Sequence, residues 1–194
     1  ATVKVKDTKL TSTGPLLITH WGMSGPAILK LSAWGARILH DKNYQFTIYV
    51  NWLNDIDAED AEKILKTTKQ KNEKKAVSKK SPFGLTNRLW ESLVLASNIE
   101  GETKWADLSK VQLQNLVNQL TNCIFQVNGK STFKEEFVTA GGIDLKEINF
   151  KTMESKLHEN LYFAGEIVNI DAITGGFNFQ NAWTSGFILA NAIC

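Results

Sequence analysis

Leu161-Tyr-Phe-Ala-Gly-Glu166 and Thr174-Gly-Gly-Phe-Asn-Phe-Gln-Asn-Ala-Trp183 are the stretches that decide how the last third of this 194-residue chain folds. The apolar run before Gly-Glu predicts a buried strand over residues 161–164. The Gly-Gly turn then leads into a helix over about residues 179–193. Backbone N–H groups at a helix N-terminus attract polar, electron-rich ligands. The pattern therefore indicates the closing part of a nucleotide-cofactor site, although no Gly-x-Gly-x-x-Gly fingerprint opens the chain.

The predicted final helix carries an apolar stripe that we expect to be buried. Its members are Ala182, Trp183, Gly186, Phe187, Ala190 and Ile193. Trp34 and Trp90 lie on similar stripes of other predicted helices. All three tryptophans are therefore expected in the core or at an interface.

The composition is that of a globular protein with a hydrophobic core, in one or two domains. Apolar residues make up 43% of the chain, and its net charge of +2 argues against a surface that binds polyanions throughout. The sequence shows neither a signal peptide nor an apolar run of membrane-spanning length, so we expect a cytoplasmic protein without membrane contact. Cys123 and Cys194 belong to no metal-binding or redox motif and are expected to be reduced thiols.

In the first 56 residues, apolar and polar side chains alternate as in β-strands, on either side of one predicted helix. Strands are predicted within residues 1–20, with a short buried one at 16–18, and over residues 44–52. Ser24-Gly-Pro26 predicts a helix start, with Ser24 as the cap and Pro26 in the first turn. The expected buried side of this helix is Ala27, Ile28, Leu31, Ala33 and Trp34.

Residues 57–122 have a helical pattern. Asp57 and Thr86 are candidate N-caps, and Ser109-Lys-Val-Gln112 has the spacing of a capping box. The apolar faces of these helices are expected to pack together as a small subdomain. Strands are predicted again over residues 123–127 and 133–139, joined by an Asn128-Gly129 turn, and over residues 153–156.

Two long, ordered blocks resemble the signatures of one family, the bacterial BaiN/YhiN-like flavoproteins. The first block is Gly14-Pro-Leu-Leu-Ile-Thr-His-Trp-Gly-Met-Ser-Gly-Pro-Ala-Ile-Leu29. The second runs from Val138-Thr-Ala-Gly-Gly-Ile-Asp-Leu-Lys-Glu-Ile148 through Thr152-Met-Glu-Ser-Lys156 to the stretches quoted above. The resemblance implies an FAD-dependent oxidoreductase, with NAD(P)H as a co-substrate.

The resemblance also implies an α+β fold of several parts. An insert would interrupt a glutathione-reductase-like, FAD-binding α/β domain. The insert would have a β-rich, barrel-like part at residues 1–56, a helical subdomain at 57–122 and a return to the β-rich part at 123–137. Residues 138–194 would be the C-terminal strand-loop-helix part of the FAD domain. The family's N-terminal dinucleotide-binding unit, which holds the ADP half of FAD, has no counterpart here. The chain is therefore expected to be a fragment that is inactive alone.

Flavin contacts follow from the same resemblance. Glu166, after Gly165, matches an acidic residue that accepts hydrogen bonds from ribityl hydroxyls. Asp171, in the same loop, would contact the ribityl chain or phosphate-bound water. The competing interpretation of Glu166 is a solvated loop carboxylate.

The glycine turn is the other half of the expected flavin site. Thr174, Gly175, Gly176 and Phe177 would bring the backbone close to the pyrimidine edge of the flavin, where the positive end of the helix stabilises negative charge. Asn178 and Gln180 would add side-chain hydrogen bonds to the ligand or merely cap the helix. An ordinary glycine turn before a helix is the alternative.

His20 is the candidate catalytic residue. It lies between an apolar strand and the Ser24-Gly-Pro26 turn, where a neutral imidazole would donate a proton after hydride transfer. The competing interpretation is a histidine that is hydrogen-bonded to local backbone. No His, Cys and carboxylate cluster has the spacing of metal ligands.

Residues 63–80 contain eight lysines and one glutamate. Such charge suits phosphate contact, and some flavoproteins act on tRNA. However, no aromatic residue between Trp52 and Phe83 offers base stacking, so a solvated helix or linker is preferred and nucleic acid is not expected as a partner. Three hypotheses remain. The first is part of an oxidoreductase that passes hydride between a nicotinamide or small substrate and an acceptor. The second is a non-enzymatic binding module, and the third is an RNA-linked flavoprotein.

Overall fold

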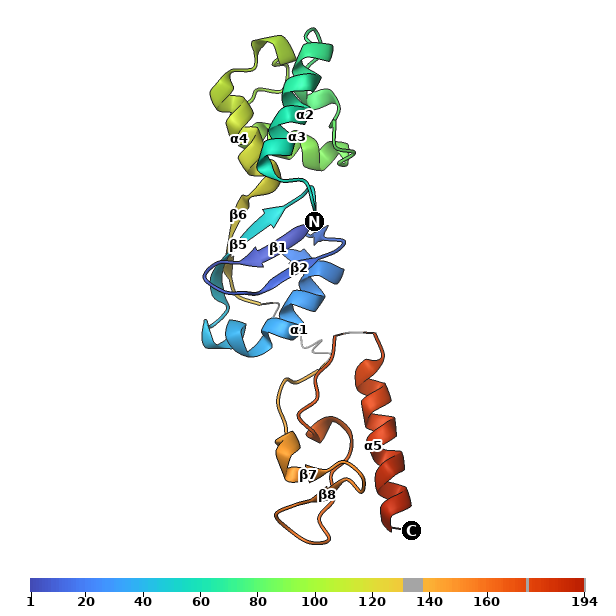
Figure 1. The fold of residues 1–194 in the computed structure, drawn as a ribbon. Helices are drawn as coiled ribbons and strands as arrows, with labels where there is room; N and C mark the ends of the chain where they lie inside the picture. Colours follow the sequence, from blue (N-terminus) through green and yellow to red (C-terminus); the bar gives the residue numbers. More distant parts are fainter. Residues whose placement is uncertain (131–137, 174, 194) are drawn as a thin grey trace.

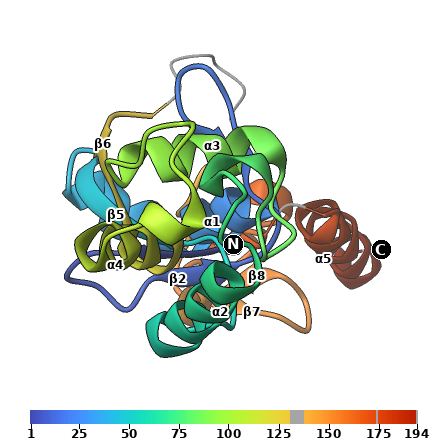
Figure 2. The same cartoon turned by 90° about the horizontal axis from the view of Figure 1, so that it is seen from above.

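The structure, a computed structural model, describes residues 1–130, 138–173 and 175–193. Its parts follow one another along a column (Figure 1). Helices α2 to α4 lie at one end, a sheet with helix α1 lies in the middle, and a C-terminal segment with helix α5 lies at the other end. Figure 2, which looks down this column, shows α5 standing to one side of it. None of the helices in the described part of the chain is both long and apolar enough to cross a bilayer.

The middle of the column is an antiparallel sheet with strand order β2-β1-β5-β6. Its strands are β1 (Thr2–Val5), β2 (Thr11–Thr13), β5 (Gln45–Asn51) and β6 (Cys123–Asn128). Val3 faces Val50 and Val5 faces Ile48 across the β1–β5 ladder, and all four side chains are buried. This alternation confirms the strands predicted at the start of the chain, over residues 44–52 and over residues 123–127. The strand predicted at 16–18 is present as Leu17–Ile18, but the prediction that it is buried was wrong, because both side chains are exposed. Most of the strand predicted over residues 133–139 lies outside the described residues.

Helix α1 (Pro26–Asp41) has its N-cap one residue later than the predicted cap, Ser24. Gly25 is the N-cap, with a φ of +92°, and no side chain caps the helix. Ser24 instead pairs with Leu17 in a short hairpin of β3 (Leu17–Ile18) and β4 (Met23–Ser24). The prediction of a Ser24 cap was wrong because that ladder already fixes the serine backbone. Pro26 occupies the first turn, as predicted.

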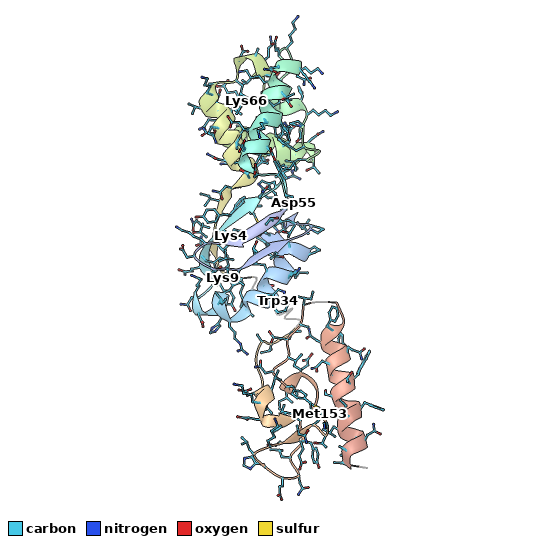
Figure 3. The ribbon with its side chains drawn as sticks, in the orientation of Figure 1. Lys4, Lys9, Trp34, Asp55, Lys66 and Met153 are labelled. Carbon is cyan, nitrogen blue, oxygen red and sulfur yellow. The ribbon has the colours of Figure 1, made fainter. Side chains whose placement is uncertain are left out.

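The side of α1 that packs on the sheet matches the predicted one at Ala27, Ile28 and Leu31. It continues through Gly35 and Leu39 in place of Ala33 and Trp34. Its buried residues are Ala27, Leu31, Gly35 and Leu39, spaced one turn apart. An added Cβ at Gly35 would lie 2.8 Å from Leu10 Cδ1, so this face needs small residues for close approach. Trp34 is 67% exposed and lies at the side of α1 toward the C-terminal segment (Figure 3). The expectation that Trp34 belongs to the core was therefore wrong.

Three helices form the upper part of the column: α2 (Ala58–Lys71), α3 (Asn87–Ala96) and α4 (Lys110–Thr121). The 3-10 helices η1 (Val77–Lys79) and η2 (Trp105–Asp107) join them. Leu65, Trp90, Leu116 and Leu120 are fully buried between the helices. These residues and the sheet residues belong to one hydrophobic core, so the predicted helical subdomain is not packed separately from the sheet.

The predicted helix starts in this region are confirmed. Asp57 caps α2 by accepting a hydrogen bond from the Asp60 N–H at 2.9 Å. Ser109 and Gln112 form the reciprocal capping box of α4. Thr86 occupies the N-cap of α3, but its side chain makes no capping hydrogen bond.

Asp57 and Thr86 give a matched comparison of stability, because only Asp57 makes a side-chain capping bond. Asp57→Ala is expected to lower the free energy of unfolding by about 1 kcal/mol, because one backbone donor of α2 loses its partner. Thr86→Ala should lower the free energy of unfolding by a few tenths of this amount at most, because no side-chain hydrogen bond is lost. Urea denaturation of both variants measures the difference, and equal losses would contradict the capping role of Asp57.

The C-terminal segment has a second, small core of Ile148, Met153 and Val168. Around it lie η3 (Leu145–Glu147), β7 (Ile148–Asn149), β8 (Glu154–Ser155), η4 (Gly165–Ile167) and α5 (Phe177–Ile193). The strand predicted at 153–156 is confirmed as β8. The buried strand predicted at 161–164 is wrong. Tyr162 forms one isolated bridge with Glu154, and Leu161 is 42% exposed, because the described residues supply no strands that would flank this run.

Helix α5 turns a different face to this core from the one predicted. Ser185 is buried, and Ile188 and Leu189 pack on the core. The predicted stripe points outward instead, with Trp183 71% and Phe187 72% exposed. Periodicity failed here because α5 carries large apolar residues on both sides, so the sequence does not mark which side meets the core.

Candidate functional site

The predicted flavin segment forms a loop that is tied back onto α5. Gly165, at φ +81°, opens η4, and its N–H donates to Ser185 Oγ at 2.9 Å. Ser185 in turn donates to the Asn181 carbonyl at 2.8 Å and is only 4% exposed. A buried serine in the third turn of α5 therefore fixes the start of the loop.

Asn178 closes the other end of the loop. Its Oδ1 accepts from the Ala172 N–H at 2.8 Å, and its Nδ2 donates to the Ala172 carbonyl at 3.1 Å. Both polar ends of the amide are thus used within the protein, and the side chain is half-buried. Asn178 holds the loop against the first turn of α5. Gln180 is exposed, and its Nε2 donates to Thr184 Oγ1 at 3.1 Å.

The glycine turn between these anchors is open to solvent. Gly175 and Gly176 have φ values of +145° and +91°, and both are exposed. An added Cβ at Gly176 would meet no atom within 4 Å. Phe177, 59% exposed, begins α5, whose first turn carries no acidic residue. The positive end of the helix dipole is therefore available to a ligand beside a bare stretch of backbone.

The predicted acidic residues of the site lie on either side of this loop. Glu166 is exposed, and its carboxylate makes no hydrogen bond or ion pair within the described ranges. Asp171 is half-buried, next to the Ala172 that Asn178 holds. Thr174 lies outside the described residues. The structure thus places Asp171 and the glycine turn beside the first turn of α5. Gly165, which precedes Glu166, is bonded to the third turn of the same helix.

His20 lies elsewhere, at the exposed tip of the β3–β4 hairpin. Its ring stacks on Trp21 with centroids 4.8 Å apart. Thr19 closes the tip through its N–H and Oγ1, which donate to the Gly22 carbonyl at 2.8 Å and 3.1 Å. No hydrogen bond, ion pair or ring contact joins His20 to the loop of residues 165–180 in the part of the chain that is described.

Arg37 is a residue near the loop that sequence reasoning missed. It lies on α1, and its Nη2 donates to Asn169 Oδ1 at 2.8 Å, across a separation of 132 residues. This bond links α1 to the C-terminal segment. It places the Arg37 guanidinium at Asn169, two residues before Asp171. No local pattern in the sequence indicates such a contact.

An outward aromatic face continues from the glycine turn along α5. Phe179 and Trp183 stack with centroids 6.2 Å apart, and they are 65% and 71% exposed. Phe187 extends the same face. So large an apolar surface is suited to contact with a flat ligand or with another protein domain.

The described residues include no group of three His, Cys, Asp or Glu side chains that could hold a metal ion. Cys123 is a free, buried thiol, and burial raises its pKa, which keeps it protonated and unreactive. Cys194 lies outside the described residues.

Comparisons with known proteins agree on one family. A family model described as "HI0933-like protein barrel and H2TH domain" matches residues 1–138. The chain is 33% identical over 178 residues to the ribosomal RNA dihydrouridine synthase of Haemophilus influenzae, covering 92% of this chain and 42% of that protein. It is 31% identical over 175 residues to the protein of the same name from Escherichia coli, covering 90% and 41%.

A relative with another activity is also found. The chain is 25% identical over 180 residues to the 3-dehydro-bile acid delta(4,6)-reductase of Clostridium scindens, covering 93% of this chain and 44% of that protein. The chain therefore spans about two-fifths of the length of the curated relatives it matches.

Proposed function

The chain belongs to the HI0933-like family, and from this premise we propose that it is part of an FAD-dependent oxidoreductase. Residues 1–137 would be the insert, with its β-rich and helical parts. Residues 138–194 would contribute the flavin-contacting part of a glutathione-reductase-like FAD domain. The match of the family model to residues 1–138 supports this division.

The observation that carries the proposal is the bare backbone of the glycine turn at the base of α5. A flavin needs a surface that its flat ring can approach and hydrogen-bond donors near its pyrimidine edge. Gly176 leaves open space where a side chain would stand, and the first turn of α5 presents backbone donors without a competing carboxylate. These features suit a flavin.

Bound FAD would take up a hydride from a donor such as NAD(P)H and deliver it to an acceptor. The chain's own residues would position and stabilise it. The N-terminus of α5 would stabilise negative charge at the pyrimidine edge. Glu166 would accept hydrogen bonds from the ribityl chain, and Asn178 would keep the glycine turn in place through its two bonds to Ala172.

We further infer that the acceptor is a carbon–carbon double bond conjugated to a carbonyl group. Dihydrouridine synthesis and the delta(4,6) reduction named for the third relative both saturate such a bond. The two relatives above 30% identity carry ribosomal RNA in their names, so a uridine in RNA is the proposed acceptor. The sequence-based expectation that nucleic acid is not a partner stays a prediction. The reduction of ribosomal RNA described below tests it.

A pair of glycine variants in the whole protein tests the flavin site. Gly176 and Gly129 both have positive φ, at +91° and +140°, and an added Cβ meets no atom within 4 Å at either position. Gly176→Ala should weaken FAD binding by about tenfold or more, because a loss of ~1.4 kcal/mol of binding free energy raises the Kd tenfold. Gly129→Ala also places a side chain at a positive φ, directly after β6, and should bind FAD normally.

Visible absorption of the purified proteins and FAD titration provide the measurement. Flavin bands in the wild type and in Gly129→Ala, but weakened in Gly176→Ala, support the proposal. Reduction of ribosomal RNA with NAD(P)H, read as a mass gain of two hydrogen atoms on a uridine, then identifies the acceptor. Absence of flavin bands from the whole protein, even after FAD is added, would overturn the oxidoreductase and favour a binding module.

A further inference from the structure

We propose that the lysines at the end of α2 and in the segment after it form a docking surface for the phosphate backbone of RNA. This inference rests on the proposed function, because it supplies the contact that an RNA substrate needs. The basic surface consists of Lys69, Lys71, Lys74, Lys75, Lys79, Lys80 and Lys104.

The structure separates the lysines of this region into two groups. Lys63 pairs with Glu59 at 2.9 Å and Lys66 pairs with Glu62 at 2.7 Å, so the first half of α2 neutralises itself. Lys71, Lys74, Lys75 and Lys80 are exposed and have no carboxylate partner among the residues that the structure describes. The positive charge is therefore concentrated beyond the middle of α2.

Residues distant in sequence add to the same surface. Ala76 forms an isolated bridge with Lys104, which places that lysine beside the segment after α2. Lys69 donates through Nζ to the Leu108 carbonyl. Lys66, Lys69, Gln70, Glu73 and Ala106 line an open hollow of about 440 Å³ between α2 and η2. Lys66 is paired with Glu62, and Glu73 brings a carboxylate to this hollow, so the charge that suits a sugar-phosphate chain comes from the exposed lysines that follow it in the chain.

A purely structural role explains only part of this charge. Lysines in the last turn of a helix complement its dipole, and that accounts for Lys69 and Lys71. Lys74, Lys75 and Lys80 lie past the end of α2 and gain nothing from it. Lys79 has a weak pairing with Glu102 at 3.9 Å, between two exposed side chains.

The position of the surface identifies the size of the partner. The helical end of the column and the segment with the glycine turn lie at opposite ends of the molecule, with the sheet between them (Figure 1). A small substrate bound near the glycine turn would not reach the basic surface, whereas a folded RNA would contact both. Because residues 53–82 contain no aromatic residue, contact would be with the backbone and independent of sequence.

The test compares two variants of equal charge change in the 194-residue chain. K71Q/K74Q/K75Q/K80Q removes four exposed lysines of the basic surface. The control, K4Q/K6Q/K9Q/K30Q, removes four exposed lysines of β1, the β1–β2 connection and α1, of which Lys4 and Lys9 are labelled in Figure 3. The probe is a fluorescein-labelled RNA hairpin of mixed sequence, and its anisotropy is followed between about 50 and about 200 mM KCl.

The basic-surface variant should bind about tenfold or more weakly at about 100 mM KCl, and the slope of log K against log salt should flatten by about 3. The control should stay near the wild type. Equal losses in the two variants, no loss in either, or no binding of the hairpin by the wild type would each overturn the proposal. So would binding of phosphatidylserine vesicles, but not RNA, through these lysines. Anisotropy needs no flavin, so its result is independent of the FAD titration that tests the proposed function.

Discussion

Gly142→Ala should unfold the C-terminal segment while leaving the rest of the molecule folded. Gly142 has a φ of +135°, and an added Cβ would overlap the Ile167 carbonyl oxygen and lie 2.8 Å from Asn169 N. These are backbone atoms, so the clash cannot be relieved by a side-chain rotation. The expected loss is about 3 kcal/mol or more, from steric overlap together with backbone strain.

The neighbouring glycine is the control for this effect. Gly141 has a similar φ of +127°, but an added Cβ there meets no atom within 4 Å. Gly141→Ala therefore carries the strain without the clash. Amide hydrogen exchange at Ile143 and Asn169, which bond across to Ile167 and Ile143, reports on the segment. Equal exchange in the two variants would contradict the steric account.

Loss of Gly142 would also affect the candidate site. The backbone of residues 142–143 lies against residues 167–169, through the isolated Ile143–Val168 bridge and the bond from Ile143 N to the Ile167 carbonyl. Those residues lead from Gly165 to Asp171. We therefore expect Gly142→Ala to weaken FAD binding in the whole protein together with the loss of protection.

Trp90→Ala is the second substitution with a large expected effect, a loss of about 3–5 kcal/mol in the free energy of unfolding. The Trp90 side chain is fully buried and packs beside Phe83, and its Nε1 donates to the Val77 carbonyl at 2.8 Å. Removing it leaves a cavity in the core that the helices share with the sheet. It also leaves the Val77 carbonyl without this bond.

Two further variants separate the causes. Trp34→Ala removes a side chain that is 67% exposed, and it should cost no more than about 0.5 kcal/mol. Trp90→Phe keeps most of the volume but loses the bond to Val77, so it should fall between the two. Urea denaturation gives all three values. A loss in Trp34→Ala as large as that in Trp90→Ala would contradict the assignment of the core.

Local signals in the sequence predicted local structure well. The Asp57 cap, the Ser109–Gln112 capping box and Pro26 in the first turn of α1 depend on residues three or four positions apart. Alternating apolar residues likewise predicted the strands that became β1, β5 and β6. In each case the residues that carry the signal lie within the element or directly beside it.

Predictions failed where a distant partner decides the outcome. Ser24 is drawn into the β3–β4 hairpin instead of capping α1, and Trp34 turns away from the sheet because small residues at Ala27 and Gly35 allow closer packing. Tyr162 forms one isolated bridge, where a strand buried between neighbouring strands was expected. The aromatic side of α5 faces outward because the small core beneath it accepts only Ser185, Ile188 and Leu189.

The candidate site shows the same division. The sequence by itself determined that Gly165, Glu166 and a glycine turn precede a helix, because these residues are adjacent along the chain. Only the tertiary structure decided that Ser185 and Asn178 hold the loop and that Arg37 reaches Asn169. It also decided that the free lysines after α2 and the C-terminal segment lie at opposite ends of the molecule. Hydrogen bonds between residues far apart in sequence, and the choice of which apolar face is buried, depend on the assembled core, which no local pattern encodes.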